Sequence, residues 1–346
     1  MDSLTHIVLG ACAGQLIAGK QLGKKAMVLG ALAQSIPDFD FIASFFLETS
    51  RDLLAHRGLT HSWLFVLILT PILTWISVVL QRRPLPGAGK WALLWGGEMA
   101  IHLLLDACNA YGTAWWFPFS RERVAFHLLF VADPLFSLWP LIVAIILFFA
   151  KPTARWRNTL AIMAIALSLT YTGVSGVHKH GIDRDMKAAA DRQQIDIKRY
   201  FSTPTAFNNL LWFVVVESDS GFYIGHRSIM DRRPPDSFRY FPRNEQLLSE
   251  VVNQREVENL KEFSNNYFVV TRQSADTIVF HDLRFGQMNG WLDPHSPFVF
   301  YYYFDRPDAN QLVVQRGRFS RWNMDIVRLF LERMCGGNPR IPESSH

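Results

Sequence analysis

The stretch HSWLFVLILTPILTWISVVL, residues 61–80, decides what kind of protein this chain forms. It contains no Asp, Glu, Lys or Arg, and a helix of about 20 such apolar residues crosses the hydrocarbon core of a bilayer. Two further stretches, 135–150 and 158–177, have the same character. The first half of the chain is therefore expected to be a helical membrane domain.

Three more apolar stretches are less regular. The stretch 91–107 fits a membrane span but carries ionisable residues, and the stretch 4–19 is short. The stretch 26–47 is interrupted at Pro37, which lacks a backbone donor, so we expect the helix to stop or turn near Ile36. The pattern predicts about five to six apolar helical segments, one of them broken at Pro37.

Composition divides the chain into two unlike halves. Charged residues are sparse up to about Val177 and dense afterwards, so the mean hydropathy of +0.08 averages over both halves. The second half has short runs rich in Val, Tyr and Phe between Gly, Pro, Asp or Asn, which is typical of strands. We expect strands in 210–216, 267–271, 277–280, 298–304 and 312–315, and helices in 179–200, within 241–263 and in 323–334. The predicted fold is a helical membrane domain, residues 1–177, followed by a mixed α+β, β-rich extramembrane domain, residues 178–346.

The charge pattern argues against a nucleic-acid partner. The net charge of +5 is modest, and the Lys and Arg residues are scattered or lie in expected membrane loops. A nucleic-acid-binding protein usually concentrates them in one basic patch. The three cysteines, Cys12, Cys108 and Cys335, predict no disulfide framework. The sequence leaves the oligomeric state open.

Basic residues in alternate loops predict the orientation in the membrane. Lys20 and Lys24 follow the first apolar stretch, Lys90 lies in the loop after the third, and Arg155 follows the fifth. Positive residues favour cytoplasmic loops, so these loops are expected on the cytoplasmic face of the membrane and the second half of the chain on the opposite face. The first stretch has no positive region before it, and we interpret it as a retained membrane segment.

His102 and Asp106 are four residues apart in an apolar stretch. On a helix this spacing puts both side chains on one face, where they could offer two ligands to one metal ion. A polar pair that joins two membrane helices has the same spacing. Ionisable groups at bilayer depth are costly, which favours a functional role. Glu98, one turn earlier, is a further candidate partner or base.

Asp38 and Asp40 directly follow the break at Pro37. In an extended backbone, residues i and i+2 point the same way, so the two carboxylates could bind one cation or bridge two. An ordinary Pro-Asp turn is the alternative. A surface turn rarely lies between two apolar runs, however, and this position keeps the functional interpretation open.

The segment HRGLTHS, residues 56–62, is the densest cluster of candidate residues. His61 opens an apolar helix, and His56 lies in the preceding loop, from which it can converge on the same point. Thr60 is the expected N-cap of the helix. Arg57 is a candidate anion clamp, because a guanidinium matches the oxygens of phosphate or carboxylate. The alternative is a basic loop that contacts lipid headgroups.

His6 is a further ligand candidate near the start of the first apolar stretch. A lone histidine at such a position is more often packed or interfacial than a metal ligand. Asp2 and Thr5 are expected to cap this helix, and Asp133, which precedes Pro134, is expected to cap another.

Four motifs in order carry a resemblance to a known family. They are MDSLTH ending at His6, IPDFD with Asp38 and Asp40, HRGLTHS with His56 and His61, and HLLLD from His102 to Asp106. This set, which extends to about Val177, resembles the bacterial membrane-bound metal-dependent hydrolases called YdjM-like. The resemblance implies an inner-membrane protein with metal-dependent hydrolase activity. It supplies no substrate and does not cover the second half of the chain.

The donor types indicate the chemistry of the expected site. The expected ligands are His6, Asp38, Asp40, His56, His61, His102 and Asp106. Mixed histidine and carboxylate donors suit zinc, with manganese or iron as alternatives. Asp40 or Asp106 could serve as a base instead of a ligand, and Arg57 would hold an anionic substrate group. A site at the membrane face favours a lipid or lipid-linked ester or phosphoester as substrate.

Two other classes of function stay open. Buried His and Asp residues beside a broken helix could line a metal or proton transport path, which predicts donors spread through the membrane depth. A non-catalytic membrane anchor that presents the second half of the chain is the other alternative. The expected topology places the donors near one membrane face, which favours an enzyme over a transporter.

Overall fold

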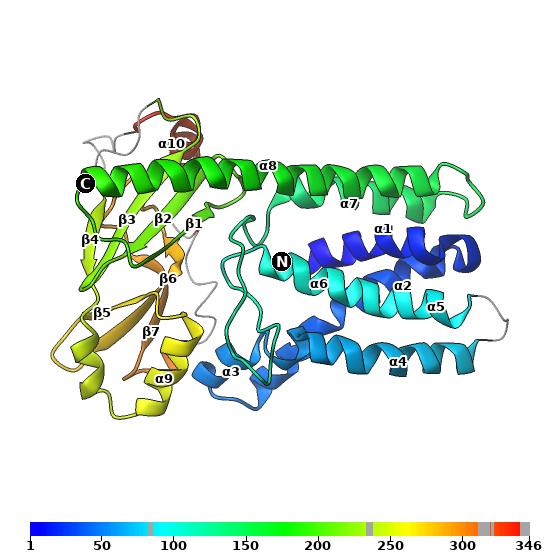
Figure 1. Cartoon of the computed structure of the whole chain (residues 1–346), viewed down its shortest axis with the longest axis horizontal. Coiled ribbons are helices and arrows are strands. Elements are labelled where there is room, and N and C mark those ends of the chain that lie inside the picture. The colour runs from blue at the N-terminus through cyan, green and yellow to red at the C-terminus, as the bar shows by residue number, and fades with distance from the viewer. Residues whose placement is uncertain (82–85, 233–237, 311–318, 320–321, 340–346) are drawn as a thin grey trace. The chain divides into compact units, whose positions relative to one another are not determined.

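The computed structural model describes residues 1–81, 86–232, 238–310, 319 and 322–339 (Figure 1). The chain folds into two compact units, Met1–Leu47 with Ala55–Ser175, and Glu48–Leu54 with Gly176–His346. The first unit is helical, and the second unit contains the β-sheets. The expected order, a helical N-terminal region followed by a β-rich C-terminal part, is confirmed.

Helices that run alongside one another build the first unit (Figure 1). Its elements are α1 (Ser3–Leu22), α2 (Lys24–Ser35), η1 (Pro37–Phe45), η2 (Leu59–His61), α4 (Trp63–Leu80), α5 (Ala88–Ala92), η3 (Leu93–Gly97), α6 (Glu98–Ala107), α7 (Pro134–Phe149) and the first part of α8 (Arg157–Arg192). All six expected apolar stretches lie largely in these helices.

Length and composition identify fewer membrane spans than the sequence predicted. Among the described residues, α4 and α8 are long and apolar enough to cross a membrane. The pair α2 and η1 passes the same test together but is bent by 51°, so the number is three if this pair is one broken span. The apolar helix α7 is shorter. The expected count of five to six membrane segments is not confirmed.

The bend between α2 and η1 follows from Pro37. This proline is the first residue of η1 and cannot donate a helical hydrogen bond, so α2 ends at Ser35 with Ile36 as its C-cap, as expected. The segment after the break is a 3₁₀ helix, which places Asp38 and Asp40 in its first turn. The extended backbone assumed for these two residues was wrong. Because a 3₁₀ helix has three residues per turn, their side chains point in different directions.

Two of the four expected capping residues are confirmed, and Thr5 lies inside α1, where its N–H donates to Asp2. Asp2 caps α1 and Asp133 caps α7, each through a side-chain oxygen that accepts a backbone N–H. The N-cap of α4 is Ser62, and the expected assignment to Thr60 was wrong. Thr60 lies instead in the 3₁₀ turn η2, which delays the start of α4 to Trp63.

Glycines allow α1 and α2 to pack closely. A Cβ atom on Gly30 would lie 2.1 Å from the carbonyl oxygen of Gly10, and a Cβ atom on Gly10 would lie 2.5 Å from that of Gly30. Small residues permit this close backbone approach between membrane helices. The contact holds α1, which carries His6, against α2, which carries Gln34.

Two antiparallel sheets form the second unit. The first sheet has the order β1 (Arg199–Pro204), β2 (Leu211–Glu217), β3 (Gly221–Ser228) and β4 (Arg239–Pro242), and the second has β5 (Phe268–Arg272), β6 (Ile278–Gln287) and β7 (Phe298–Tyr303). One buried cluster contains Val215 and Phe222 from the first sheet and Leu283 from the second, so the sheets share a core. The helical elements of this unit are most of α3 (Thr49–Ala55), the rest of α8, η4 (Glu245–Glu250), α9 (Gln254–Phe263), η5 (Pro307–Asn310) and α10 (Met324–Met334).

Expected and observed elements of the second unit agree in part. The strands expected in 210–216, 267–271, 277–280 and 298–304 correspond to β2, β5, β6 and β7, whereas β1, β3 and β4 were not expected. The stretch 312–315 lies outside the described residues. The polar helix expected in 179–200 continues α8 without a break but ends at Arg192, and β1 takes up the chain from Arg199.

Candidate metal centre

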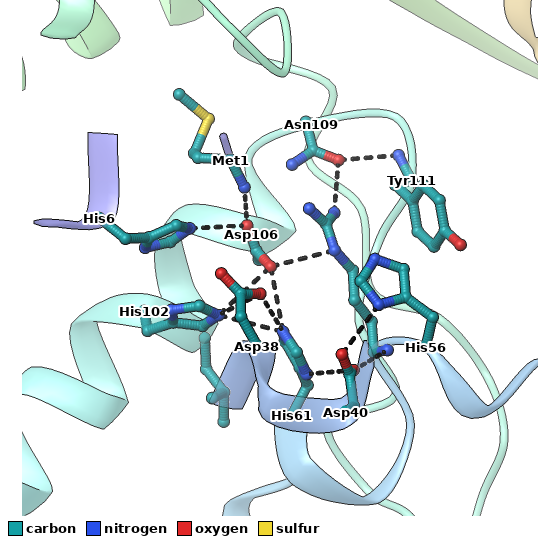
Figure 2. Close-up of polar contacts among 12 residues, drawn as sticks. Met1, His6, Asp38, Asp40, His56, His61, His102, Asp106, Asn109 and Tyr111 are labelled. Atoms are coloured by element: carbon teal, nitrogen blue, oxygen red, sulfur yellow. Dashed lines mark hydrogen bonds and ion pairs between the residues drawn. The ribbon is translucent and has the colours of Figure 1, made fainter. Parts of the chain in front are cut away.

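Four side chains of the first unit bring their donor atoms to one point. They belong to Asp38, His61, His102 and Asp106, and one donor atom from each lies within 4.8 Å of every other (Figure 2). Both histidines and Asp106 are fully buried, and the Asp38 side chain is 23% exposed. His102 and Asp106 face this point from one turn of α6, as their spacing predicted.

We call these four atoms the four-atom group, and five of the six distances among them are close to those of a tetrahedral site, while the sixth, between the Asp38 and Asp106 oxygens, is at most 4.8 Å. The Nε2 atoms of His61 and His102 are 3.0 Å apart, and Oδ2 of Asp106 lies 3.2 and 3.5 Å from them, respectively. Oδ1 of Asp38 lies 3.6 and 3.5 Å from the same two nitrogens. In a tetrahedral zinc site with bonds of about 2.0–2.1 Å, ligand atoms are about 3.3–3.4 Å apart. The donor set therefore fits a four-coordinate divalent cation.

Three elements position the group. Asp38 lies in η1 directly after the bend at Pro37, and His61 is the last residue of η2, just before α4. The other two residues come from α6, which follows the π-helical turn η3. Such π-helical turns often occur near functional sites.

The Nδ1 atoms of the two histidines have partners outside the group. Nδ1 of His102 lies 2.6 Å from the backbone oxygen of Gln34. Nδ1 of His61 lies 3.4 Å from Oδ2 of Asp40 and 3.0 Å from the Thr60 hydroxyl. A histidine that donates its Nδ1–H to a carbonyl or carboxylate keeps the Nε2 lone pair for a metal, and this arrangement is usual for metal-bound histidine.

Asp40 connects η1 to the loop that carries His56. Its Oδ2 accepts the backbone N–H of Arg57 at 2.7 Å, and its Oδ1 lies 3.0 Å from Nδ1 of His56. The N–H bond holds Arg57 in the left-handed region, at φ 60°, which residues other than glycine seldom adopt. Burial lowers the pKa of His56, whereas its hydrogen bond to Asp40 acts in the opposite direction. Both Asp40 and His56 lie beside the four-atom group and not in it.

The Arg57 guanidinium lies directly against the group. Its Nε is 3.1 Å from Oδ2 of Asp106, and its Nη1 donates to Oδ1 of Asn109 at 3.0 Å. The guanidinium of Arg57 is 4.7 Å from the ring centre of Tyr111, and that of Arg123 is 5.4 Å from the same centre. Burial lowers the pKa of Arg57, while Tyr111 and nearby carboxylates raise it, and a guanidinium stays charged at neutral pH. A fixed positive charge thus adjoins the candidate metal position.

His6 contacts the other side of Asp106. Its Nε2 lies 3.2 Å from Oδ1 of Asp106, the oxygen that is not in the four-atom group, and the Met1 amine contacts the same oxygen. Nδ1 of His6 lies 3.1 Å from the side-chain oxygen of Gln34. The His6 ring also stacks on the ring of His102, with centroids 3.8 Å apart.

All seven expected ligands therefore belong to one connected cluster, and four of them form the group. Their roles as ligands stay predictions. Four residues around the group were not expected from the sequence, namely Gln34, Asn109, Tyr111 and Arg123. A neutral amide such as Gln34 gives no spacing signal, but Asn109 and Tyr111 follow Asp106 so closely that their polarity could have identified them.

The chain has relatives in bacteria. Residues 1–182 match the family described as YdjM inner membrane protein. The chain is 25% identical over 308 residues to the "uncharacterized protein YfhP" of Bacillus subtilis (strain 168), which covers 86% of this chain and 90% of YfhP. It is 25% identical over 122 residues to the "inner membrane protein YbcI" of Escherichia coli (strain K12), which covers 35% of this chain and 69% of YbcI. No solved structure is significantly similar.

The family match includes the whole candidate centre, from His6 to Asp106, and ends within α8. Because it spans more than half of the sequence, the chain belongs to the YdjM inner membrane protein family.

Proposed function

We propose that this protein is a membrane-bound metal-dependent hydrolase centred on Asp38, His61, His102 and Asp106. The observation that carries the proposal is the spacing of 3.0–3.6 Å that separates the two histidine Nε2 atoms from each other and from the Asp38 and Asp106 oxygens. Mixed donors of this kind favour zinc, with manganese or iron as alternatives. A divalent cation held there supplies Lewis-acid polarisation of an ester or phosphoester and activates water.

Arg57 is proposed to hold an anionic group of the substrate. Its guanidinium lies beside Asp106, and the Arg123 guanidinium shares the Tyr111 ring with it. The cluster has the three carboxylates of Asp38, Asp40 and Asp106 against these two guanidinium groups. With neutral histidines, these carboxylates leave the side chains of the cluster with a small excess of negative charge. A bound divalent cation would change this excess into a positive charge. This balance favours a substrate with a negative charge near the scissile bond.

Asp40 and His56 are proposed to move the proton. Both oxygens of Asp40 already have partners, and one of these is the partly buried ring of His56 at 3.0 Å. A carboxylate that orients an imidazole in this way is a common arrangement for a general base. We therefore assign the proton transfer to His56 with Asp40 behind it, and the direct contact with a cation to Asp106.

A lipid or lipid-linked ester or phosphoester is the proposed substrate class. The 3₁₀ helix η1 carries Asp38 and Asp40, and it also exposes Phe39, Phe41 and Phe45 by 48%, 55% and 74%. An element with two carboxylates of the candidate centre and exposed aromatic rings suits a substrate with a polar head and an apolar chain. The family is an inner-membrane family, which agrees with this class.

The clustering of the donors supports a chemical centre more than a transport path. A path through the membrane would need donors at several depths. Here the donor atoms of the four-atom group lie within 4.8 Å of one another, and the other candidate ligands contact their neighbours.

Metal analysis of the purified full-length protein tests the proposal. We expect about one equivalent of a divalent metal in the wild type and a large loss in His102→Ala and Asp106→Ala. His180→Ala, a change of an exposed histidine in α8, serves as the control and should retain the metal. Wild-type protein that binds neither zinc, manganese nor iron would overturn the proposal.

Activity is tested on lipids in mixed micelles. We expect metal-dependent hydrolysis of a phospholipid or a lipid-linked phosphoester, with a higher KM for Arg57→Lys, because lysine cannot offer the two-pronged contact of a guanidinium. An exposed arginine in the nearby loop, Arg121, provides the control Arg121→Lys. A carboxyl ester hydrolysed in preference to every phosphoester would restrict the substrate to uncharged esters.

The multi-pass topology and the outside location of the second half are also proposals. They rest on the basic residues of the alternate loops and on the apolar helices α4 and α8. Reporter fusions after Arg83 and after Lys179 should give opposite signals, with the Lys179 fusion outside. Equal signals from the two fusions would contradict this topology.

A further inference from the structure

A buried chain of polar side chains extends from the candidate centre into the helical unit. Nε2 of His6 lies 3.2 Å from Oδ1 of Asp106, and Nδ1 of His6 lies 3.1 Å from Oε1 of Gln34. The Gln34 amide nitrogen in turn donates to Oε2 of Glu98 at 3.2 Å. All four residues are fully buried. These hydrogen-bonded side chains therefore join three helices, α1, α2 and α6, without contact with solvent.

Such a chain is costly in an apolar interior. A buried polar group loses its water partners, and a buried carboxyl group loses most. Among the described residues, Oε1 of Glu98 has no hydrogen-bond partner, so Glu98 gains little stability in return. An unfavourable group that lies one helical turn before His102 indicates a role at the centre.

The hydrogen bonds among these side chains can run in the direction that orients Asp106, with His6 as the donor. An ionised carboxylate only accepts hydrogen bonds, so the contact of His6 with Oδ1 of Asp106 requires a proton on Nε2 of His6. The Gln34 amide can meet Nδ1 of His6 with either its oxygen or, turned over, its nitrogen, and Glu98 takes the opposite end. A neutral His6 that donates from Nε2 accepts at Nδ1, so the Gln34 amide turns its nitrogen toward His6 and its oxygen toward Glu98, whose carboxyl group then donates. In this arrangement His6 donates to Oδ1, which leaves Oδ2 of Asp106 for the four-atom group.

Gln34 serves a second ligand through its backbone. Its carbonyl oxygen lies 2.6 Å from Nδ1 of His102, and its side chain supports Asp106 through His6. One residue of α2 is thus connected to both candidate ligands of α6. A substitution of the side chain leaves the backbone contact in place, so the two functions can be separated.

We propose that His6, Gln34 and Glu98 are positioning residues that set the orientation of Asp106 toward a bound cation. This inference rests on the proposed metal centre. It changes the expected role of His6 from ligand to support, and it assigns a role to Glu98. Residues that support a ligand in this way typically contribute about 10- to 100-fold to metal affinity.

The test compares two buried glutamines in the full-length protein. Gln34→Met keeps the length of the side chain but removes both polar ends. Gln15→Met is the matched control, because Gln15 is 2% exposed, accepts from Arg157 at 2.7 Å, donates to Asn158 at 2.9 Å, and makes no contact with the centre. Both variants lose buried hydrogen bonds, so both should be less stable. Only Gln34→Met should bind zinc about 10- to 100-fold more weakly.

Cobalt substitution provides a readout that loss of stability alone does not change. At saturating Co²⁺, the visible spectrum reports the geometry of the bound ion, and we expect a changed spectrum for Gln34→Met and an unchanged one for Gln15→Met. Glu98→Gln keeps a side chain that can donate to or accept from the Gln34 amide and should retain the wild-type affinity, whereas Glu98→Leu should weaken it.

The outcomes separate this inference from the proposed function. Wild-type protein without bound metal overturns both. Normal metal binding in the wild type, together with wild-type affinity and spectrum in Gln34→Met, overturns the positioning role alone. Equal losses in Gln34→Met and Gln15→Met also overturn it, because the effect would then be general destabilisation. Wild-type metal affinity in Glu98→Leu would show that Glu98 has no positioning role.

Discussion

At the scale of single residues, Asp40 shows how one carboxylate can organise a site from outside. Its two oxygens hold the backbone of Arg57 and the ring of His56, and one of them also faces Nδ1 of His61. A carboxylate behind a metal-bound histidine fixes the orientation of the ring and raises its basicity. Asp40 therefore influences a candidate ligand, a candidate base and the anion clamp together.

Asp40→Asn tests this influence with almost no change of shape. We expect zinc affinity to fall by about 10- to 100-fold, because an amide supports the His61 ring less well than a carboxylate does. The affinity is measured by competition with a zinc-binding dye. Asp276→Asn, in an exposed turn of the second unit, is the control. Unchanged zinc affinity in Asp40→Asn would show that the carboxylate does not support a ligand.

His226 predicts how the second unit responds to acid. Burial and, to a smaller extent, the Arg333 guanidinium lower the pKa of His226 to about 3. Between an unfolded value of about 6.5 and this folded value, the unfolded chain binds the proton and the folded chain does not. The contribution of His226 is thus constant above about pH 6.5. Stability falls below that pH by at most about 1.4 kcal/mol per pH unit.

Thermal unfolding of the β-sheet signal at pH 7.5 and pH 5 measures this effect. His226→Phe keeps a ring against Phe213, whose centre is 5.2 Å away, and should show a smaller difference between the two pH values than the wild type. His295→Phe, a change of an exposed histidine, should keep the wild-type difference. The same difference in all three proteins would contradict the prediction.

At the scale of elements, the close packing of α1 and α2 supports the candidate centre, because it holds His6 beside Gln34. Gly30→Leu should separate the two helices, since even a Cβ atom at this position would lie 2.1 Å from the Gly10 backbone oxygen. We expect a loss of about 1–3 kcal/mol, measured by thermal unfolding of the helical signal. In Gly173→Ala of α8, the added Cβ meets no atom within 4 Å, and stability should be unchanged or slightly higher. Equal stability of the two variants would exclude a tight α1–α2 interface.

Sequence patterns predicted some elements well and others poorly, for physical reasons. The break at Pro37 and the shared face of His102 and Asp106 follow from local geometry, and both were predictable. The strand β3 was not predictable, because Gly221 and Gly225 weaken its local strand pattern. Pairing with its neighbours in the sheet overrides this weak preference. By residue type, either Thr60 or Ser62 could cap α4. Ser62 is the cap because the 3₁₀ turn η2, which contains Thr60, delays the start of the helix. Contacts between distant segments, such as Gln34 with Glu98, leave no local pattern at all.

At the scale of the whole molecule, the candidate centre and the β-sheets belong to different units. The family match covers residues 1–182, whereas the similarity to YfhP covers 86% of this chain and so includes much of the second unit as well. The four residues of the group all lie in the first unit. The ability to bind metal should therefore be a property of that unit.

A chain that ends after Arg192, the last residue of α8, tests this division. We expect it to bind a divalent metal with the stoichiometry of the full-length protein, as measured by elemental analysis. The same shortened chain with His102→Ala should bind none. A shortened chain that keeps its helical content but binds no metal would show that the second unit is needed for the site.

The bend after α2, the turn before α4 and the body of α6 each contribute to the four-atom group. An ion bound to all three would act as a cross-link between parts of the chain that are far apart in the sequence, much as a disulfide does. The ion would then stabilise the folded state in proportion to the logarithm of its free concentration. Resistance to heat in the helical unit would follow the metal supply of the cell, and chelation would remove the proposed activity and the cross-link together.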